Sequence, residues 1–380
     1  LMVGSRLTPA RAPRRFLSFF RQSPFTGEWV VFARERRNRP KQITAAEKQR
    51  TSSLPEHEPL CPFCPGNEAQ TPEPKIEYSD SNGRWRLRVV PNKFPAFAPL
   101  TDASPGMKKQ MELARQSLLP EVEAFGFHEV VIETPRHNGI LALSTQEELE
   151  LLVKAWRERS LTLSRQAEVK HTICFKNQGG GAGASLLHPH AQIVGFPLVP
   201  QPVQARIEFA REQFQKVNDS VFSLSVAQEL EKMERGERHR IIDHNDMFVA
   251  GVPFAAKSPY SITILPKPQF QHAHFCEISD EELREFTGIL HSSLRRLHTT
   301  LGEPDYNLVL ATAPQKTWRP MVAYNVDKFY SWHAILIPRL GLGAMAGFEF
   351  GSGIFSNANL PEDDAQTLRD AVWDPQQSRA

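Results

Sequence analysis

Apolar and polar residues alternate along this 380-residue chain in two different patterns. Short runs of aliphatic, aromatic and β-branched residues lie between turn residues and prolines, which predicts strands over 29–33, 85–90, 128–134, 260–268, 306–312 and 331–338. Two longer segments, 144–163 and 279–298, open with Ser or Thr and acidic residues and carry apolar residues at helical spacing. Each half therefore contains, in the same order, a strand that ends at prolines, a helix and two more strands.

This repeated order predicts an α+β fold built from one duplicated unit. We expect residues 21–200 to form the first repeat, residues 241–380 to form the second, and residues 201–240 to link them as helices. Residues 1–20 contain four arginines and no acidic residue, which is typical of a basic leader without fixed structure. An organelle-targeting segment has a similar composition and is the alternative.

Composition and charge narrow the class of protein. Hydrophobic residues make up 40% of the chain and charged residues 23%, as in ordinary soluble enzymes. A net charge of +2 gives no reason to expect nucleic acid or a membrane as a partner, and no apolar run approaches the roughly 20 residues that span a bilayer. Two of the four cysteines form Cys61-x-x-Cys64 and two are isolated, which is not a disulfide framework. We therefore expect a cytoplasmic protein.

The strongest chemical signal is a run of small residues that leads into two histidines. Residues 177–185 read NQGGGAGAS, and His188 and His190 follow in the sequence HPHAQ. Small residues let a backbone approach a ligand and turn its N–H groups toward phosphate oxygens, and a neutral imidazole can attack phosphorus or bind a metal. The pattern favours phosphoryl or nucleotidyl chemistry. The alternative is a glycine loop that runs into a strand with buried histidines.

The spacing Cys61-x-x-Cys64 suits two thiolates that bind one Zn²⁺ from a tight turn. No second pair of this kind exists, so the other ligands should be histidines, and His137 and His188 are the best placed. If His188 binds zinc, His190 is free to act as the nucleophile. A redox pair, or chance spacing, is the alternative interpretation of the two cysteines.

Two polar neighbours could assist a nucleophilic imidazole. Gln192 lies two residues after His190, on the same face of the predicted strand, where it could bind a phosphoryl oxygen or orient the ring. Ser185 could donate a hydrogen bond to another phosphate oxygen. The alternative is that both residues have no catalytic role, because polar residues are common in loops and on the exposed faces of strands.

Together these motifs resemble the galactose-1-phosphate uridylyltransferase family, a branch of the histidine-triad superfamily with two fused triad-type repeats. The resemblance extends from about residue 21 to residue 369. It rests on RQSPFTGEWVVFARERRNRP from residue 21, CPFCPGNEAQTPEP from 61, VVPNKFPAF from 89, ETPRHN from 133, FKNQGGGAGASLLHPHAQ from 175 and GFEFGSGIF from 347. Each repeat is then expected to be an antiparallel sheet with helices packed on it.

The resemblance assigns roles to the residues already singled out. It implies a Zn²⁺ cofactor held by Cys61, Cys64, His137 and His188. It implies that His190 attacks the α-phosphorus of a nucleotide-sugar, expels a sugar 1-phosphate and is regenerated when a second sugar phosphate accepts the nucleotidyl group.

Further site residues are implied in the same way. Ser185 matches a phosphate-binding serine, and Gln192 matches the glutamine that supports the covalent intermediate. The nucleotide- and substrate-binding positions of the family fall on Asn92, Phe94, Asn177, Gly183 and Glu349. Family members are commonly homodimers, although nothing in the chain itself indicates an oligomeric state.

The chain also departs from the family pattern. Lys93 stands where well-known members carry Asp, Phe348 replaces a hexose-binding tyrosine, and the preceding stretch 343–347 lacks the family's lysine. Only His333 remains of a second-repeat His-x-His that binds a metal in some members. These changes resemble a divergent branch that includes an ADP-glucose phosphorylase of plant type, in which phosphate accepts the nucleotidyl group.

We therefore expect uridylyl transfer between UDP-glucose and a hexose 1-phosphate, with nucleotide-sugar and sugar 1-phosphate as the partners. An ADP-sugar phosphorylase is the nearest alternative, and a hydrolase of nucleotide conjugates is the third. A zinc-stabilised binding protein without turnover is the alternative from a different functional class.

Overall fold

Ten strands form one continuous sheet in the computed structural model, which describes residues 18–34, 51–99, 106–114, 116–316, 318, 325–340 and 346–373. The strand order is β3-β4-β5-β7-β6-β11-β12-β10-β9-β8, and all neighbours are antiparallel. These strands are β3 (Ile76–Ser79), β4 (Trp85–Pro91), β5 (Phe127–Ile132), β6 (His171–Gln178), β7 (His190–Phe196), β8 (Ile241–His244), β9 (Phe248–Gly251), β10 (Ile262–Pro266), β11 (Tyr306–Ala311) and β12 (His333–Pro338).

The two halves of this sheet have the same connectivity, which confirms the α+β fold with a duplicated unit. The fourth strand of each half, β6 or β11, lies at the centre of the whole sheet. The fifth strand, β7 or β12, lies beside it. The helix α2 (Gln146–Ser164) connects β5 to β6, and α5 (Asp280–Leu301) connects β10 to β11 at the equivalent place. The two sheets are not separate, because β6 and β11 pair through residues 174–178 and 306–310 and join the halves edge to edge.

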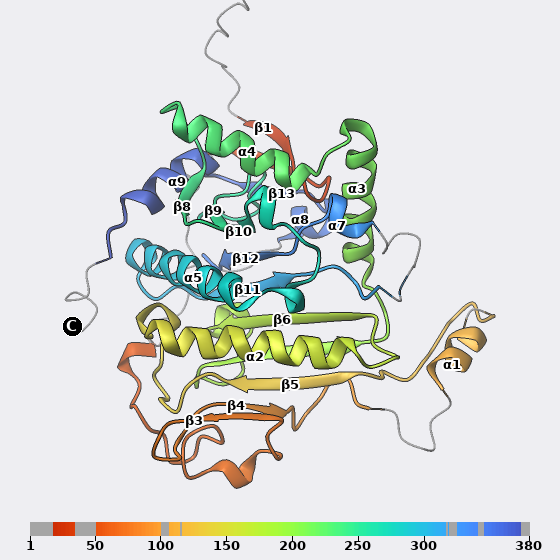
Figure 1. Cartoon of the computed structure of the whole chain (residues 1–380), viewed down its shortest axis with the longest axis vertical. Coiled ribbons are helices and arrows are strands. Elements are labelled where there is room, and N and C mark those ends of the chain that lie inside the picture. The colour runs from red at the N-terminus through yellow and green to blue at the C-terminus, as the bar shows by residue number, and fades with distance from the viewer. Residues whose placement is uncertain are drawn as a thin grey trace, which may run out of the picture.

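The helices α2 and α5 lie side by side on one face of the sheet (Figure 1). Both begin at capping boxes within the segments that the sequence predicted to open helices: Thr145 caps α2 with Glu148, and Ser279 caps α5 with Glu282. Their apolar faces cover the core, in which Trp156 of α2 is fully buried. Burial of a large side chain of this kind contributes about 1.5–3 kcal/mol.

A second, three-stranded sheet contains β1 (Ser18–Gln22), β2 (Trp29–Ala33) and β13 (Phe355–Asn357), with β13 parallel to β2. Val30 and Phe32 of β2 pack against Ala255 and Leu360. The first described strands therefore lie against the second half of the chain, although the sequence placed them with the first repeat. Of the expected leader, residues 1–17 lie outside the described part, and residues 18–20 begin β1.

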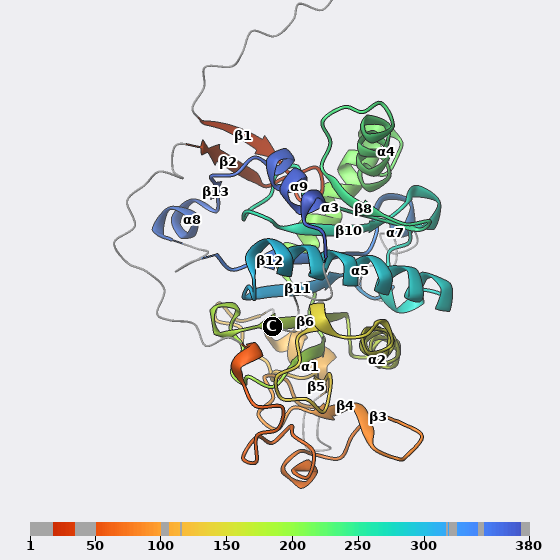
Figure 2. The same cartoon turned by 90° about the vertical axis from the view of Figure 1, so that its left-hand side faces the viewer.

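The remaining helices lie around this framework (Figures 1 and 2). They are α1 (Met107–Ala114), α3 (Gln201–Val217), α4 (Val221–Glu234), α7 (Val326–Phe329), α8 (Gly347–Ser352) and α9 (Pro361–Asp370). The segment 201–240, expected to be helical, contains α3 and α4. None of the described helices is long and apolar enough to cross a membrane.

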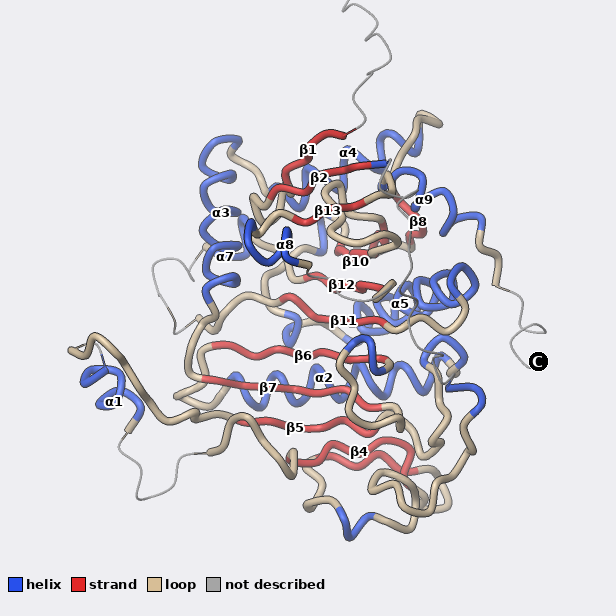
Figure 3. Tube along the Cα trace, turned by 180° about the vertical axis from the view of Figure 1, so that it is seen from behind, coloured by secondary structure: helices blue, strands red, loops and turns tan. Residues whose placement is uncertain are grey.

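The other face of the sheet carries loops and α8 rather than the two long helices, which lie behind the strands in Figure 3. Ala191 and Ile193 of β7 are buried in the core beneath α2. Since side chains alternate along a strand, His190 and Gln192 point to the opposite face. The candidate site is therefore on the side of the sheet away from the long helices.

Candidate active site and metal centre

Four side chains from separate parts of the first half meet in a buried cluster. Cys61 and Cys64 come from a tight turn, His137 follows β5, and His188 lies two residues before the start of β7. One nitrogen or sulfur atom from each lies within 4.8 Å of the others. The sequence placed these four residues together, and the structure brings them together.

Hydrogen bonds orient the two imidazoles of this cluster. His188 Nε2 is 2.8 Å from the carbonyl oxygen of Thr134, which accepts its proton and leaves the lone pair on Nδ1. That Nδ1 lies 3.7 Å from Cys61 Sγ and 3.6 Å from Cys64 Sγ. His137 Nδ1 lies 3.5 Å from Cys64 Sγ.

These distances match a four-coordinate metal site. With metal–sulfur bonds of about 2.3 Å and metal–nitrogen bonds of about 2.0–2.1 Å, a tetrahedral centre requires sulfur–nitrogen separations of about 3.6 Å. The three sulfur–nitrogen distances given above are 3.5, 3.6 and 3.7 Å. The cluster could therefore hold a metal ion without rearrangement of its ligands.

Burial sets the protonation of these groups when no cation neutralises them. It lowers the pKa of His188 to about 4, against the opposing effect of the bond to Thr134. It raises the pKa of Cys61 to about 11. The imidazole is therefore ready to bind a cation near neutral pH, whereas the thiol must lose its proton when the cation binds.

His190 is placed differently from His188. It is the first residue of β7 and is 7% exposed. Its Nδ1 lies 2.8 Å from the carbonyl oxygen of His188, which accepts the ring proton and leaves the lone pair on Nε2. Burial lowers the pKa of His190, the bond to the His188 carbonyl opposes this shift, and the charge of Lys176 adds to it. The ring is therefore neutral near neutral pH.

The turn that carries the two cysteines also touches both imidazoles. Phe63, between Cys61 and Cys64, packs edge-on against His188 and His190, with ring centroids 5.9 and 5.7 Å apart. The metal cluster and the candidate nucleophile are thus packed against one aromatic side chain.

A cavity of about 590 Å³ adjoins His190. The first half lines it with residues 176–181 and 184–190, which include the glycine loop. The second half lines it with residues 301, 303–305, 339 and 340, and Thr51 completes the wall. The candidate nucleophile and the predicted phosphate cradle therefore face one cavity between the two halves.

Asp305, just before β11, fixes the conformation of the glycine loop. Its Oδ2 accepts a hydrogen bond from the N–H of Gly181 at 2.8 Å. Gly179 has a φ of +80°, and a Cβ there would lie 1.9 Å from Asp305 Oδ1. Only glycine therefore fits this close approach.

Asn307 of β11 holds the loop at a second point. Its Nδ2 donates to Oδ1 of Asn177 at 2.8 Å and to the carbonyl oxygen of Ala182 at 2.9 Å. Asn177 is thus fixed at the start of the loop, and Gly183 comes directly after the loop's short helical turn, Gly180–Ala182.

A buried ion pair supports the backbone at the nucleophile. Lys176 Nζ lies 2.9 Å from both carboxylate oxygens of Glu133 and 3.4 Å from the carbonyl oxygen of His190. Both side chains are almost fully buried, and their opposite charges compensate each other.

Gln192 lies further along β7 and bonds to a histidine rather than to the cavity. The N–H of Ala96 donates to His128 Nδ1 at 3.1 Å, which leaves the ring proton on Nε2, and Nε2 donates to Gln192 Oε1 at 2.6 Å. Asn92 packs on the same ring, with its amide nitrogen 3.2 Å from Nε2. The structure therefore brings Gln192 and Asn92 together through His128.

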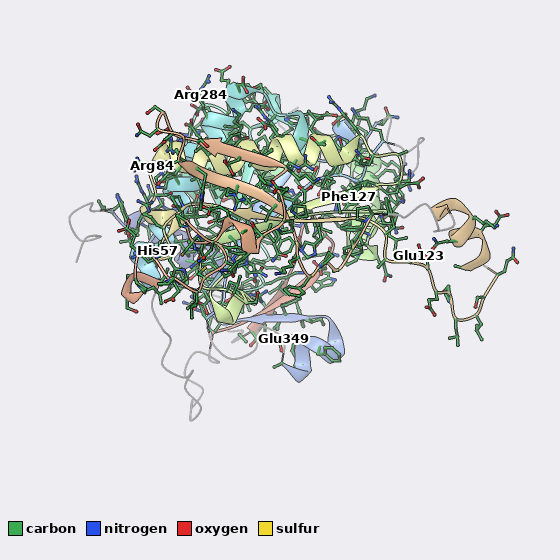
Figure 4. All side chains as sticks on the ribbon, turned by 90° about the horizontal axis from the view of Figure 1, so that it is seen from below. His57, Arg84, Glu123, Phe127, Arg284 and Glu349 are labelled. Atoms are coloured by element: carbon green, nitrogen blue, oxygen red, sulfur yellow. The ribbon has the colours of Figure 1, made fainter. Side chains whose placement is uncertain are left out.

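The other predicted residues are more dispersed. Ser185 is exposed and lines the cavity. Phe94 is 84% exposed and is tied to Asn92 by its backbone N–H, outside the cavity wall. Glu349 on α8 does not line the cavity either, and Figure 4 shows it on the opposite side of the molecule from Arg284 of α5. Within one described chain, neither Phe94 nor Glu349 meets the nucleophile.

Sequence reasoning missed the residues that support the site from elsewhere in the fold: Glu133, Lys176, His128, Asp305, Asn307 and Arg339. Lys176 could have been noticed as a charged residue inside an otherwise apolar strand, and His128 as a polar residue at the start of another. The three residues of the second half gave no signal, because only strand pairing between β6 and β11 brings them to the loop.

Known proteins match both this sequence and this arrangement. The family model for galactose-1-phosphate uridyl transferase, N-terminal domain, matches residues 12–200. The chain belongs to the galactose-1-phosphate uridylyltransferase family. Within this family it is 29% identical over 356 residues to an ADP-glucose phosphorylase of Arabidopsis thaliana, a match that covers 92% of each chain. It is also 29% identical over 355 residues to a galactose-1-phosphate uridylyltransferase of Thermotoga maritima, covering 92% of this chain and 97% of that protein.

Solved structures of the family agree with the fold. The crystal structure of the Arabidopsis thaliana ADP-glucose phosphorylase with bound ADP-glucose has a TM-score of 0.75 at 27% identity, over 94% of this chain and 99% of that chain. A uridylyltransferase structure has a TM-score of 0.66 at 25% identity, over 95% and 99%. Relatives named for two different reactions therefore match this family member over nearly its whole length.

Proposed function

We propose that this chain is a nucleotidyltransferase that carries the nucleotidyl group on His190. One observation carries the proposal: Nδ1 of His190 donates to the carbonyl of His188, so the Nε2 lone pair remains available beside the glycine-loop cavity. A nucleophilic imidazole requires this tautomer.

In the first step, Nε2 of His190 forms a bond to the α-phosphorus of a nucleoside diphosphate sugar. The bond from that phosphorus to the bridging oxygen breaks, and the sugar 1-phosphate leaves with the electron pair. The ring becomes positively charged, and its Nδ1–H bond to the carbonyl of His188 strengthens as the charge develops. Ser185, exposed on the cavity wall, is available to donate to a phosphate oxygen.

Residues around the nucleophile act as positioning groups. Lys176 holds the carbonyl of His190, and its charge is balanced by Glu133. Asp305 and Asn307 hold the loop from the second half. A pre-arranged site of this kind lowers the barrier because little reorganisation is left for the transition state.

Our first candidate reaction is uridylyl transfer from UDP-glucose to a hexose 1-phosphate, with nucleotide-sugar and sugar 1-phosphate as the substrates. It is supported by the matching family model and by the Thermotoga maritima relative. Adenylyl transfer from an ADP-sugar to phosphate is the second candidate. The higher TM-score of the ADP-glucose phosphorylase, together with Lys93 and Phe348 at diverged positions, favours this second reaction.

We also propose that the metal held by the cluster is Zn²⁺. Two sulfur and two nitrogen donors at tetrahedral spacing suit Zn²⁺ better than hard cations, which prefer oxygen ligands. A closed set of four protein ligands leaves no open position, which is typical of a structural zinc site. Its contribution is then to tie the turn at Cys61, the end of β5 and the start of β7 into one unit.

Intact-mass measurement tests the covalent step. The protein is mixed in turn with UDP-glucose and with ADP-glucose, and we expect a mass increase that corresponds to one uridylyl or one adenylyl group per chain. The adduct should be absent in His190→Gln and present in His333→Gln, which changes the equivalent histidine of the second repeat.

The mass of the adduct identifies the base. Its discharge by galactose 1-phosphate, by inorganic phosphate or by water identifies the acceptor. If neither nucleotide-sugar leaves an adduct on the wild-type protein, both transferase candidates are wrong, and the chain is a binding protein.

A further inference from the structure

Arg339 directly follows β12 and lines the same cavity as His190. Two hydrogen bonds fix it against the end of β11 that faces the glycine loop. Its backbone N–H donates to the carbonyl of Asp305 at 2.7 Å, and its side-chain Nε donates to Oδ1 of Asn307 at 2.5 Å. The same Asn307 holds the glycine loop, so the arginine and the loop share one support.

The two terminal nitrogens of Arg339 are not used by this support. Nη1 and Nη2 make no hydrogen bond or ion pair within the part of the chain that the structure describes. Arg339 as a residue is half-buried. A fork of N–H donors that is held at one edge and free at the other is suited to a phosphate or carboxylate ligand.

The other charged groups on the cavity wall are already engaged. Lys176 pairs with Glu133, Asp305 accepts from the glycine loop, and Glu303 accepts from the backbone N–H of Ser52 at 3.2 Å. Among the described lining residues, Arg339 is therefore the cation without an anionic partner.

We propose that Arg339 binds the phosphate group that leaves the α-phosphorus and the phosphate group that later attacks it. The inference rests on the proposed nucleotidyl transfer and extends it to the acceptor, which is then a phosphate or a sugar phosphate rather than water. In the first step the leaving group is the sugar 1-phosphate, whose phosphate is the β-phosphate of the donor. In the second step the acceptor attacks the α-phosphorus of the same adduct, on the side opposite His190. The acceptor phosphate therefore occupies the position that the β-phosphate left.

In the second step, an oxygen of the acceptor phosphate forms a bond to the α-phosphorus while the bond to His190 Nε2 breaks. The electron pair of that bond returns to the ring, which regains its neutral form. Arg339 neutralises the charge of the acceptor as it approaches the nucleotidyl phosphate, which is itself an anion. Water carries no such charge, so Arg339 favours a phosphate acceptor over hydrolysis.

Two measurements test the role of Arg339. The first loads wild-type protein and Arg339→Gln with the nucleotidyl group and follows discharge against the concentration of inorganic phosphate or galactose 1-phosphate. We expect Arg339→Gln to raise the half-maximal acceptor concentration by about 10- to 100-fold, as for the loss of a charge-assisted hydrogen bond. Slow hydrolysis of the adduct by water should change by less than about twofold.

The conservative variant Arg339→Lys should fall between the two, since lysine keeps the charge but not the fork. Arg84→Gln is the matched control, because Arg84 is an exposed arginine outside the cavity. Melting temperatures of all variants show whether the loss of the bond to Asn307 unfolds the site. A wild-type acceptor dependence in folded Arg339→Gln would overturn the proposal.

The second measurement needs no turnover. Titration calorimetry with inorganic pyrophosphate should show binding to the wild-type protein that is at least about tenfold weaker in Arg339→Gln. If the wild-type protein forms no adduct but Arg339→Gln loses pyrophosphate binding, the proposed function fails and the phosphate site stands. Equal pyrophosphate affinity in Arg339→Gln and wild type overturns the site itself.

Discussion

The starts of β7 and β12 are the same position in two copies of one repeat, and each is a buried histidine. His190 donates its Nδ1–H to the carbonyl of His188 at 2.8 Å, and His333 donates its Nδ1–H to the carbonyl of Ser331 at 3.0 Å. In front of His190 lies a cavity, whereas the ring of His333 packs against Phe222, with centroids 5.5 Å apart. The repeat therefore supplies the oriented imidazole in both halves.

The loop before each strand separates the two positions. Residues 179–183 contain four glycines, and the equivalent segment 312–332 contains none. Aromatic side chains fill the space in front of His333, which is 3% exposed. The fold therefore sets the tautomer of both imidazoles, while access to each ring depends on whether a cavity or packed aromatic side chains lie in front of it.

The largest effect should come from the metal cluster, which is confined to the first half of the chain. Cys61→Ser removes one of four ligands, and we expect loss of the bound metal and of at least about 3 kcal/mol of unfolding free energy, because metal binding contributes to folding. Metal content by mass spectrometry and unfolding in urea measure both. Chelation of the wild-type protein should give the same loss.

Cys276→Ser is the control for this prediction, because Cys276 lies in the second half and outside the cluster. It should keep the metal and lose less than about 1 kcal/mol. A metal-free wild-type protein with an unchanged melting temperature and full activity would show that the cluster does not stabilise the start of β7.

An intermediate effect is expected at the glycine loop. Gly179→Ala places a Cβ against Asp305 at a φ that side chains rarely adopt, so we expect a cost of about 2–4 kcal/mol and a drop of at least about 30-fold in the rate of adduct formation. Stopped reactions with mass detection give the rate. The strained backbone should move the loop away from His190.

Gly236→Ala is matched to it, because Gly236 also has a positive φ (+66°) but has no atom within 4 Å of the new Cβ. It should cost about 1 kcal/mol and leave adduct formation unchanged. Equal effects of the two substitutions would mean that backbone strain alone, and not the contact with Asp305, explains the result.

The smallest effect should be seen at His333. Burial, together with the charge of Arg206, lowers its pKa to about 3. Between about pH 6.5, the ordinary histidine pKa, and pH 3, this histidine is protonated in the unfolded chain but not in the folded chain. The free energy of unfolding therefore decreases as the pH falls from about 6.5 toward 3. His333→Gln removes this group and should reduce the slope of unfolding free energy against pH by up to about 1.4 kcal/mol per pH unit.

Urea unfolding at pH 7.5, 6 and 5 measures the slope, with His244→Gln, at an exposed histidine, as the control. At pH 7.5 we expect His333→Gln to lose only about 1 kcal/mol. An unchanged slope would show that His333 is protonated in the folded protein, and the two imidazoles would then differ in charge as well as in access.

Much of the fold could be predicted because its signals are local. The predicted strand at 29–33 has the same bounds as β2, and both long helices begin at their capping boxes. The histidines and cysteines of the cluster were also predictable, since ligand spacing and position after a strand are properties of short segments. The pairing of β6 with β11 was not predictable, because it depends on contact between residues more than 120 positions apart.

The missed site residues have the same cause. Asp305 and Asn307 are ordinary polar residues at the start of a strand, and only the joined sheet places them against the glycine loop. The role of Glu349 rests on a motif match alone and stays a prediction, because this residue does not line the cavity of one chain. Sequence motifs identified the chemistry, and the long-range topology decided which residues surround it.

The pairing of β6 with β11 has a consequence for any attempt to divide the enzyme. A fragment that ends near residue 200 would keep both cysteines and all three histidines of the site, yet it would expose the whole edge of β6 as an unpaired strand. Unpaired edges recruit other strands, so such a fragment should self-associate through that edge. If the second half were supplied as a separate chain, its strand β11 would have to pair with the β6 edge. Self-association of the first fragment would compete for the backbone N–H and C=O groups of that same edge.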